Sequence, residues 1–147
     1  MIQVEIGFQV LEADWSRDES AIALVRRQVF IEEQAVPEAM EWETQDPACD
    51  WFVAKDGGGA IVGIARLTPD ARIGRMAVLP GWRRRGVGTA LLQAALAKAR
   101  QKGLPQVSLH AQVHALLFYG RFGFQARGPE FEEAGIPHRE MSLVLTE

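Results

Sequence analysis

The order strand, long helix, strand between residues 72 and 111 constrains the fold more than any other feature of this sequence. Residues 72–79 form a strand-like apolar run, and residues 87–102 carry one apolar stripe at helical spacing. Residues 106–111 predict a second short strand. Two strands joined through a crossover helix form a right-handed unit in which the strands are parallel. The chain is therefore expected to contain a parallel pair of strands.

Shorter connections elsewhere predict antiparallel pairing, so the complete sheet is expected to be mixed. An Asp and three glycines at 56–59 and the sequence Thr-Pro-Asp-Ala at 68–71 are turn sequences typical of hairpins. Residues 34–50 contain two prolines and many carboxylates, which predicts a loop with a short helical turn. The other expected elements are strands at 3–11, 51–55, 61–67 and 140–145 and helices at 19–32 and 114–122.

The composition predicts one domain over residues 1–147 in a reducing compartment. With 147 residues, of which 48% are hydrophobic, the chain can bury one sizeable core. Its net charge of -3 gives no overall positive field for nucleic acid, and its single cysteine, Cys49, excludes an internal disulfide. The sequence has no run of about 18 apolar residues and no basic start followed by an apolar segment. We therefore expect a cytoplasmic protein that binds neither nucleic acid nor a membrane.

The residues that join the strand at 72–79 to the long helix have the chemistry of a phosphate site. The first N–H groups of a helix are unpaired and carry a partial positive charge, which suits an anion. Gly86 and Gly88 allow close approach of the backbone to phosphate oxygens, and Arg83, Arg84 and Arg85 add positive charge. Dinucleotide-binding and P-loop patterns do not occur here. Arg-x-x-Gly-x-Gly is short enough to recur by chance, but its place between a strand and a crossover helix favours a pyrophosphate site.

Two motifs, in the expected order, make the sequence similar to the GNAT superfamily of N-acetyltransferases. Arg-x-x-Gly-x-Gly at 83–88, preceded by Val-x-Pro at 78–80, matches the acetyl-CoA signature of that superfamily. The run at 115–124 resembles its second motif, Ala-x-x-Phe/Leu-Tyr-x-x-x-Gly-Phe. Segments at 29–37, 109–112 and 131–141 resemble, more narrowly, the small bacterial ElaA-like or YjcF-like branch.

The resemblance implies an α/β fold of the α+β type, with a mixed, mostly antiparallel central sheet, one splayed parallel pair and about four flanking helices. It implies acetyl-CoA as co-substrate, with the pantetheine arm between the splayed strands. Many members carry Asn where this sequence has Gln112, and Gln can form similar hydrogen bonds. The residues expected at the cofactor are Met76, Ala77, Val78, Arg83, Arg84, Arg85, Gly86, Val87, Gly88, Thr89, Gln112 and Tyr119.

The resemblance also implies a catalytic role for Tyr119, the only tyrosine of the chain. Its counterpart lies beside the CoA sulfur, where a phenol can protonate the leaving thiolate; the alternative is an aromatic core residue. An alkylamine must lose a proton before it attacks, and Glu33, His110 and His138 are the candidate bases. Each could instead be a solvated carboxylate or a partly buried imidazole. No metal is expected, because no Glu or Cys ligand accompanies His110 and His114.

These features predict an N-acetyltransferase that moves an acetyl group from acetyl-CoA to a primary amine by direct attack in a ternary complex. The acceptor could be a small molecule or a peptide. Carboxylates at 32–46 and 130–133 could attract a cationic amine, although ordinary solvated loops explain them equally well. Two alternatives stay open, a non-catalytic acyl-CoA-binding module and an acyltransferase that uses a different acyl-CoA. The closing strand and the tryptophan-rich loop could also pair with a second copy in a homodimer.

Overall fold

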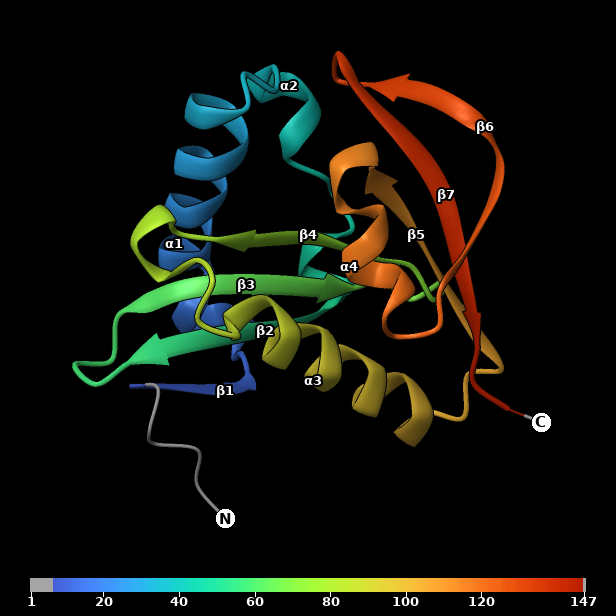
Figure 1. Cartoon of the computed structure of the whole chain (residues 1–147). Coiled ribbons are helices and arrows are strands. Elements are labelled where there is room, and N and C mark those ends of the chain that lie inside the picture. The colour runs from blue at the N-terminus through green and yellow to red at the C-terminus, as the bar shows by residue number, and fades with distance from the viewer. Residues whose placement is uncertain (1–6, 147) are drawn as a thin grey trace.

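The computed structural model describes residues 7–146, which form two sheets and four α-helices (Figure 1). The first sheet is antiparallel, with the strand order β1-β2-β3-β4. The strands predicted at 51–55, 61–67 and 72–79 are confirmed to within one residue at each end. Residues 3–6 of the first expected strand lie outside the described residues. The bounds are β1 Phe8–Glu12, β2 Asp50–Asp56, β3 Ile61–Leu67 and β4 Ile73–Val78.

The second sheet has the order β5-β7-β6, with antiparallel pairing throughout. Its strands are β5 Gln106–Gln112, β6 Gln125–Glu133 and β7 Ile136–Val144. The sequence predicts β5 and the second half of β7 but misses β6. Gly128 and Pro129 interrupt β6, and most of its side chains are exposed, so it lacks an alternating pattern. Proline is tolerated there because β6 is an edge strand whose register shifts around these residues.

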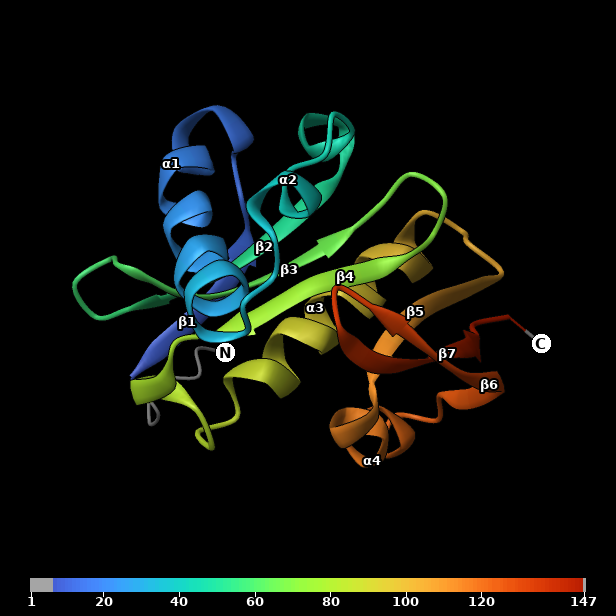
Figure 2. The same cartoon turned by 90° about the horizontal axis from the view of Figure 1, so that it is seen from above.

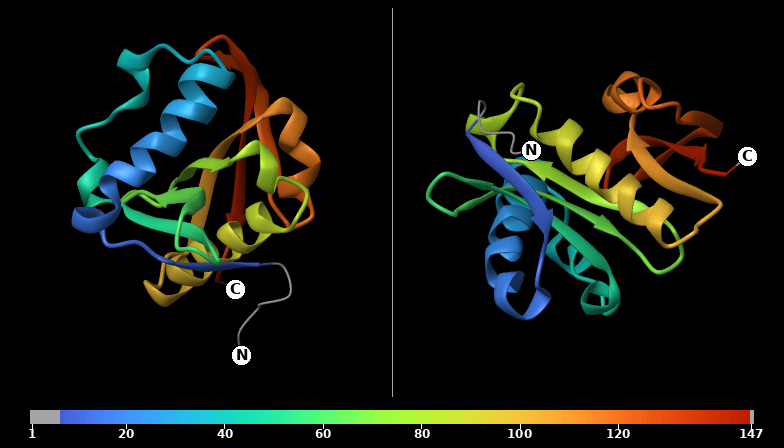
Figure 3. Two further views of the ribbon diagram at one scale, coloured as in Figure 1. Left: turned by 90° about the vertical axis from the view of Figure 1, so that its left-hand side faces the viewer. Right: turned by 90° about the horizontal axis from the view of Figure 1, so that it is seen from below.

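Helices cover both faces of the first sheet (Figure 2). α1 Trp15–Arg26 continues into a π-helical segment, η1 Arg27–Glu33, and packs against β3 and β4 on one face. α3 Val87–Gln101 packs on the other face, where its apolar stripe enters the larger of two core clusters (Figure 3). The first helix starts four residues before the predicted position, because Asp14 caps it by accepting a hydrogen bond from the N–H of Arg17.

The remaining helices are short and lie in the connections. The loop expected at 34–50 contains α2 Glu38–Glu41 and a 3-10 turn, Asp46–Ala48. The helix predicted at 114–122 is a 3-10 turn, Val113–Ala115, followed by α4 Leu116–Gly120. In the described part of the chain, no helix is both long enough and apolar enough to cross a bilayer.

The two sheets touch at one end of β4 and separate along the rest of that strand (Figure 1). An isolated parallel bridge joins Arg72 to Ser108, at the start of β4 and β5. The predicted splayed parallel pair is therefore confirmed. β4 also contains a bulge, since its register against β3 shifts, and Arg75 within it has a φ of 49°. Bulges re-aim side chains and interrupt pairing, and this one faces the gap between the sheets.

Candidate functional site

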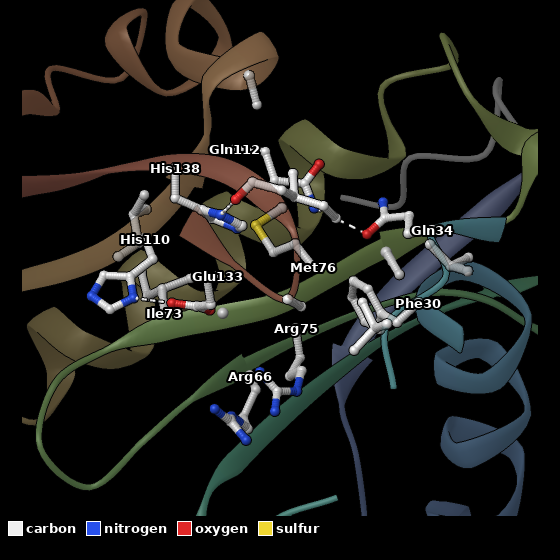
Figure 4. A pocket seen from close by; sticks show the side chains of 18 of the residues that line it. Phe30, Gln34, Arg66, Ile73, Arg75, Met76, His110, Gln112, Glu133 and His138 are labelled. Carbon is white, nitrogen blue, oxygen red and sulfur yellow. Dashed lines mark hydrogen bonds and ion pairs between the residues drawn. The ribbon is translucent and has the colours of Figure 1, made fainter. Parts of the chain in front are cut away.

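A cavity of about 1330 Å³ lies where β4 and β5 separate (Figure 4). Its walls come from β4, β5, β7, α4 and the π-helical segment η1, so segments far apart in the sequence meet there. Among the residues predicted from the sequence, it brings together Glu33, Met76, Ala77, Val78, Arg83, His110, Gln112, Tyr119 and His138. Outside it, in the turn that begins α3, lie Arg84, Arg85, Gly86, Val87, Gly88 and Thr89.

The turn before α3 presents its main chain outward. Gly86 is the N-cap residue of α3 and has a φ of 83°, in the left-handed region that favours glycine. A Cβ built on Gly86 would meet no atom within 4 Å, so the space in front of this residue is open. Within residues 7–146, none of the N–H groups from Arg84 to Thr89 donates a hydrogen bond. Unpaired N–H groups around a helix start fit a diphosphate.

The side chain of Arg83 makes hydrogen bonds that the side chains of Arg84 and Arg85 do not make. Its Nε donates to the carbonyl oxygen of Val78 at 2.9 Å, and its two terminal nitrogens donate to the Glu33 carboxylate at 2.6 and 2.8 Å. The guanidinium of Arg85 lies over the ring of Trp82, 4.7 Å from its centroid. Arg83 thus ties the end of η1 to the turn, while Arg85 is held beside the open main chain.

The same ion pair makes Glu33 a weak base. The hydrogen bonds from Arg83, together with its charge, hold the pKa of the Glu33 carboxyl below its ordinary value, although partial burial opposes this. A carboxylate with a lowered pKa takes up a proton from an ammonium less readily. The ion pair between Glu33 and Arg83 therefore joins η1 to the turn before α3.

Tyr119, on α4, points across the gap to β4. Its Oη donates to the Sδ of Met76 at 3.6 Å, and its ring makes edge-to-face contacts with Phe118 and Phe124. Burial raises the pKa of Tyr119 to about 12. The phenol is therefore protonated at neutral pH and can act as a hydrogen-bond donor or an acid at this point of the cavity wall.

His110 is held on both sides. Its Nδ1 lies 2.8 Å from a carboxylate oxygen of Glu133, and its Nε2 faces a guanidinium nitrogen of Arg72. Because a guanidinium only donates, Nε2 must accept and Nδ1 must donate to Glu133. The lone pair of the neutral ring is therefore already engaged.

In contrast to His110, His138 on β7 keeps one ring nitrogen without a hydrogen-bond partner in the described part of the chain. Its Nδ1 lies 2.7 Å from the carbonyl oxygen of Ile136 and donates to it, which leaves Nε2 as the accepting nitrogen. Its ring stacks on Phe131 with an interplanar angle of 20°, and the residue is only 7% exposed. In the described part of the chain, Nε2 of His138 has no hydrogen-bond partner. Of the three candidate bases, this imidazole is the one with a free lone pair in the cavity wall.

Gln112 and Gln34 bridge the cavity from opposite sides (Figure 4). The side-chain nitrogen of Gln112 donates to the side-chain oxygen of Gln34 at 3.0 Å, and the oxygen of Gln112 lies 2.6 Å from Nε2 of His114. Gln112 is thus placed at the end of β5, as expected. Sequence reasoning misses Gln34, whose one signal is its position directly after Glu33.

The carboxylates between α2 and β2 do not form an open acidic surface. Instead they pair with arginines, which the sequence analysis did not anticipate because the partners come from α1, β3 and β4. Close contacts join Arg26 to Glu41 at 2.8 Å and to Asp46 at 2.9 Å. Asp46 also pairs with Arg66 at 2.9 Å, and most of this cluster is buried. Buried charges of this kind are stable only when paired.

Comparisons with known proteins agree with this geometry. Residues 12–145 match the family described as "Acetyltransferase (GNAT) domain". YjcF of Bacillus subtilis, described as an uncharacterized N-acetyltransferase, is 32% identical over 120 residues, which cover 80% of this chain and 86% of YjcF.

Two solved structures share the fold over nearly the whole chain. Escherichia coli ElaA has a TM-score of 0.79 and 28% identity, and the match covers 92% of this chain and 97% of ElaA. An acyl-CoA N-acyltransferase from Pseudomonas aeruginosa has a TM-score of 0.80 and 27% identity, with the same coverage of 92% and 97%. The chain therefore belongs to the GNAT acetyltransferase family and, within it, to the ElaA/YjcF-like branch.

Proposed function

We propose that this protein transfers an acetyl group from acetyl-CoA to a primary amine by direct attack in a ternary complex. The observation that carries the proposal is the contact of Tyr119 with Met76, in the wall of a cavity that also contains the free nitrogen of His138. An acid and a base thus share one cavity. Membership of a family that uses acyl-CoA supports the same activity.

The cofactor would be held by main chain, with the positive charge of Arg83, Arg84 and Arg85 around it. The N–H groups from Arg84 to Thr89 suit the diphosphate, and the open space in front of Gly86 leaves room for it. Met76, Ala77 and Val78 line the cavity on the side of β4 that faces β5, and Gln112 lines it from β5. When bound there, acetyl-CoA supplies a thioester as the acyl donor. An unpaired N–H group of β4 next to the thioester would stabilise negative charge on its oxygen.

Tyr119 is the proposed acid and His138 the proposed base. Nε2 of His138 would first take a proton from the ammonium form of the acceptor, which frees the lone pair that attacks the thioester carbon. As the C–N bond forms and the C–S bond breaks, Oη of Tyr119 would give its proton to the departing sulfur, and the nitrogen of the new amide would pass its extra proton to the Tyr119 oxygen. The raised pKa of Tyr119, about 12, keeps this proton on the phenol over the whole range in which the protein is expected to work. Ionisation of Tyr119 should therefore cause no loss of activity between about pH 7 and pH 10.

His110 and Glu33 are assigned supporting roles. Both have their accepting atoms engaged, His110 with Arg72 and Glu33 with Arg83. A base that must first break a contact with a guanidinium is a weaker candidate than His138. We therefore expect His110 to orient Arg72 and Glu133, and Glu33 to connect the acceptor side with the cofactor turn.

The test is release of free CoA from acetyl-CoA in the presence of a broad mixture of amines. Tyr119→Phe should lower turnover by about 100-fold, the size typical of lost general-acid catalysis, while acetyl-CoA affinity stays within about twofold. His138→Gln should produce a loss of at least tenfold, and His110→Gln a smaller one. Full turnover of Tyr119→Phe would remove it as the acid. Binding of acetyl-CoA by the wild type without CoA release under any condition would favour a non-catalytic acyl-CoA-binding module.

A further inference from the structure

The arginines in the cavity wall indicate the chemical class of the acceptor. Arg66 on β3 and Arg75 on β4 line the cavity (Figure 4). Arg72, just before β4, lines it as well. We propose that the acceptor is a primary amine that also bears a carboxylate, and that Arg72 and Arg75 hold this carboxylate. The inference rests on the proposed N-acetyltransferase function and specifies its substrate class.

Glu41 and Glu43, two of the carboxylates in this wall, already pair with arginines and are therefore not free to bind an ammonium group of the acceptor. Glu41 accepts from Arg26 at 2.8 Å and lies 3.0 Å from Nε of Arg75. Glu43 accepts from Arg66 at 2.7 Å and lies 3.7 Å from Arg75. Burial raises the pKa of Glu41, against the opposing charges of Arg75 and Arg26. The negative charge of Glu41 is balanced by the two guanidinium groups that contact it.

The arginines, in contrast, keep unused donors. Nη1 of Arg75 and both Nε and Nη2 of Arg72 have no hydrogen-bond partner among residues 7–146. Both side chains are partly exposed to the cavity. Nε of Arg66 is also without an acceptor, although it is buried. A guanidinium has five N–H donors and no acceptor, so a ligand that binds these donors has to supply acceptor atoms, as a carboxylate does.

Glu43 is an internal precedent for such a contact. Its two oxygens face Arg66 and Arg75, so one carboxylate already lies between two of the three guanidinium groups. Arg75 stands in the β4 bulge with a φ of 49°, a strained conformation for a residue with a side chain. It directly precedes Met76, which contacts the proposed acid. An anion held by Arg75 therefore lies in the same cavity as Met76 and Tyr119.

The rest of the cavity wall indicates what else the acceptor carries. Phe30, Val36, Met40 and Ile73 contribute apolar surface. A cavity that combines an apolar surface with guanidinium donors suits a small amine with an apolar substituent and a carboxylate, as in an apolar amino acid. This differs from the cationic acceptor suggested by the carboxylate-rich sequence of 32–46.

Two matched acceptor series test the proposal. One consists of leucine, leucinamide and 3-methylbutylamine, and the other of phenylalanine, phenylalaninamide and phenethylamine. Within each series the amine and the apolar group are kept while the carboxylate is neutralised or removed. CoA release gives kcat/KM for each compound, and calorimetry on the protein saturated with CoA gives its affinity without requiring turnover. We expect the amino acid to exceed its amide and its amine by roughly tenfold or more in both measurements.

Variants of the cavity wall test whether its arginines cause the preference for amino acids over their amides. Arg72→Gln should lower the affinity for the amino acid by about tenfold and leave that for the amide within about twofold. Arg100→Gln, at an exposed position on α3 outside the cavity, is the matched control and should change neither. Melting curves of both variants verify that they are folded.

The outcomes separate this proposal from the one on which it rests. CoA release with the amides or simple amines in preference to the amino acids would overturn the carboxylate proposal and leave the N-acetyltransferase function standing. Preferential binding of the amino acids without CoA release would support the carboxylate site and count against the enzymatic function. Failure of the amino acids to bind or react would overturn the carboxylate proposal.

Discussion

The proposed cofactor turn and the proposed acceptor wall are built in different ways. The turn lies outside the cavity and consists of consecutive residues, Arg84 to Thr89, whose main-chain N–H groups donate no hydrogen bond within residues 7–146. The acceptor wall includes side chains from α2, β3 and β4, such as Glu41, Arg66 and Arg75, whose ion pairs join segments that are distant in the sequence. A site made of local main chain can be recognised in a sequence, whereas a site made of distant pairs becomes visible only in the folded structure.

This contrast predicts that changes in the buried ion pairs around Arg26 act mainly on stability, and that changes in the proposed cofactor turn act mainly on acetyl-CoA affinity. Arg26→Met should have the largest effect, because it leaves Glu41 and Asp46 buried without the cation that contacts both. Removal of one partner from a buried ion pair destabilises a protein by about 3–5 kcal/mol. Urea unfolding at neutral pH measures this loss of unfolding free energy.

The matched control for this variant is Arg27→Met at the next position in the chain. Arg27 also pairs with a carboxylate, Glu38 at 2.6 Å, but the two side chains are 43% and 53% exposed. An exposed pair contributes at most about 1 kcal/mol. Equal losses of stability for the two variants would show that the buried cluster is no more important than a surface ion pair.

The next largest effect is expected for Gly86→Glu. Its side chain and negative charge would occupy the space in front of the turn, and its φ of 83° is unfavourable for any residue with a Cβ. We expect acetyl-CoA affinity to fall by about 100-fold, or about 2.7 kcal/mol, as measured by calorimetry. Gly57→Glu, in the exposed turn between β2 and β3, is the control and should bind acetyl-CoA normally.

The smallest effect is expected for the ion pair between Glu33 and Arg83, which joins η1 to the turn before α3. The lowered pKa of Glu33 means that its ionised form is favoured by folding, so the contribution of Glu33 to stability is present above its ordinary pKa of about 4.3 and is lost as the pH falls through the lowered value. Because both side chains of the Glu33–Arg83 pair are about 40% exposed, Glu33→Gln should cost less than about 1 kcal/mol at pH 7. The difference from wild type should disappear under acidic conditions. A difference that instead grows below pH 4 in thermal unfolding would contradict this assignment.

The contrast also explains how much the sequence could predict. The strands of the first sheet, the long helix and the cofactor turn follow from local patterns, and so does the splayed strand pair once the crossover is recognised. β6 could not be predicted, because Gly128 and Pro129 disrupt its pattern and its exposed residues carry no alternation. Its pairing with β7 is instead determined by the hairpin.

For the site, the sequence indicates which residues take part but not how they are paired. Glu33, His110 and His138 are equivalent candidate bases in the sequence, and only their contacts distinguish them: Arg83 with the first, Arg72 with the second and a backbone carbonyl with the third. The arginines of the acceptor wall have no local signature, and Gln34 is marked only by its position after Glu33 in the segment 29–37. Their roles depend on contacts between segments that are tens of residues apart.

The central claim, that the main chain from Arg84 to Thr89 binds the diphosphate of acetyl-CoA, is tested most directly by NMR. A titration with acetyl-CoA, followed through backbone amide resonances, should give the largest shifts at these residues and little change at Gly57 in the distant hairpin turn. Desulfo-CoA, which keeps the diphosphate but lacks the thiol, should produce the same pattern. Unchanged amide resonances in the turn at saturating acetyl-CoA would contradict the account.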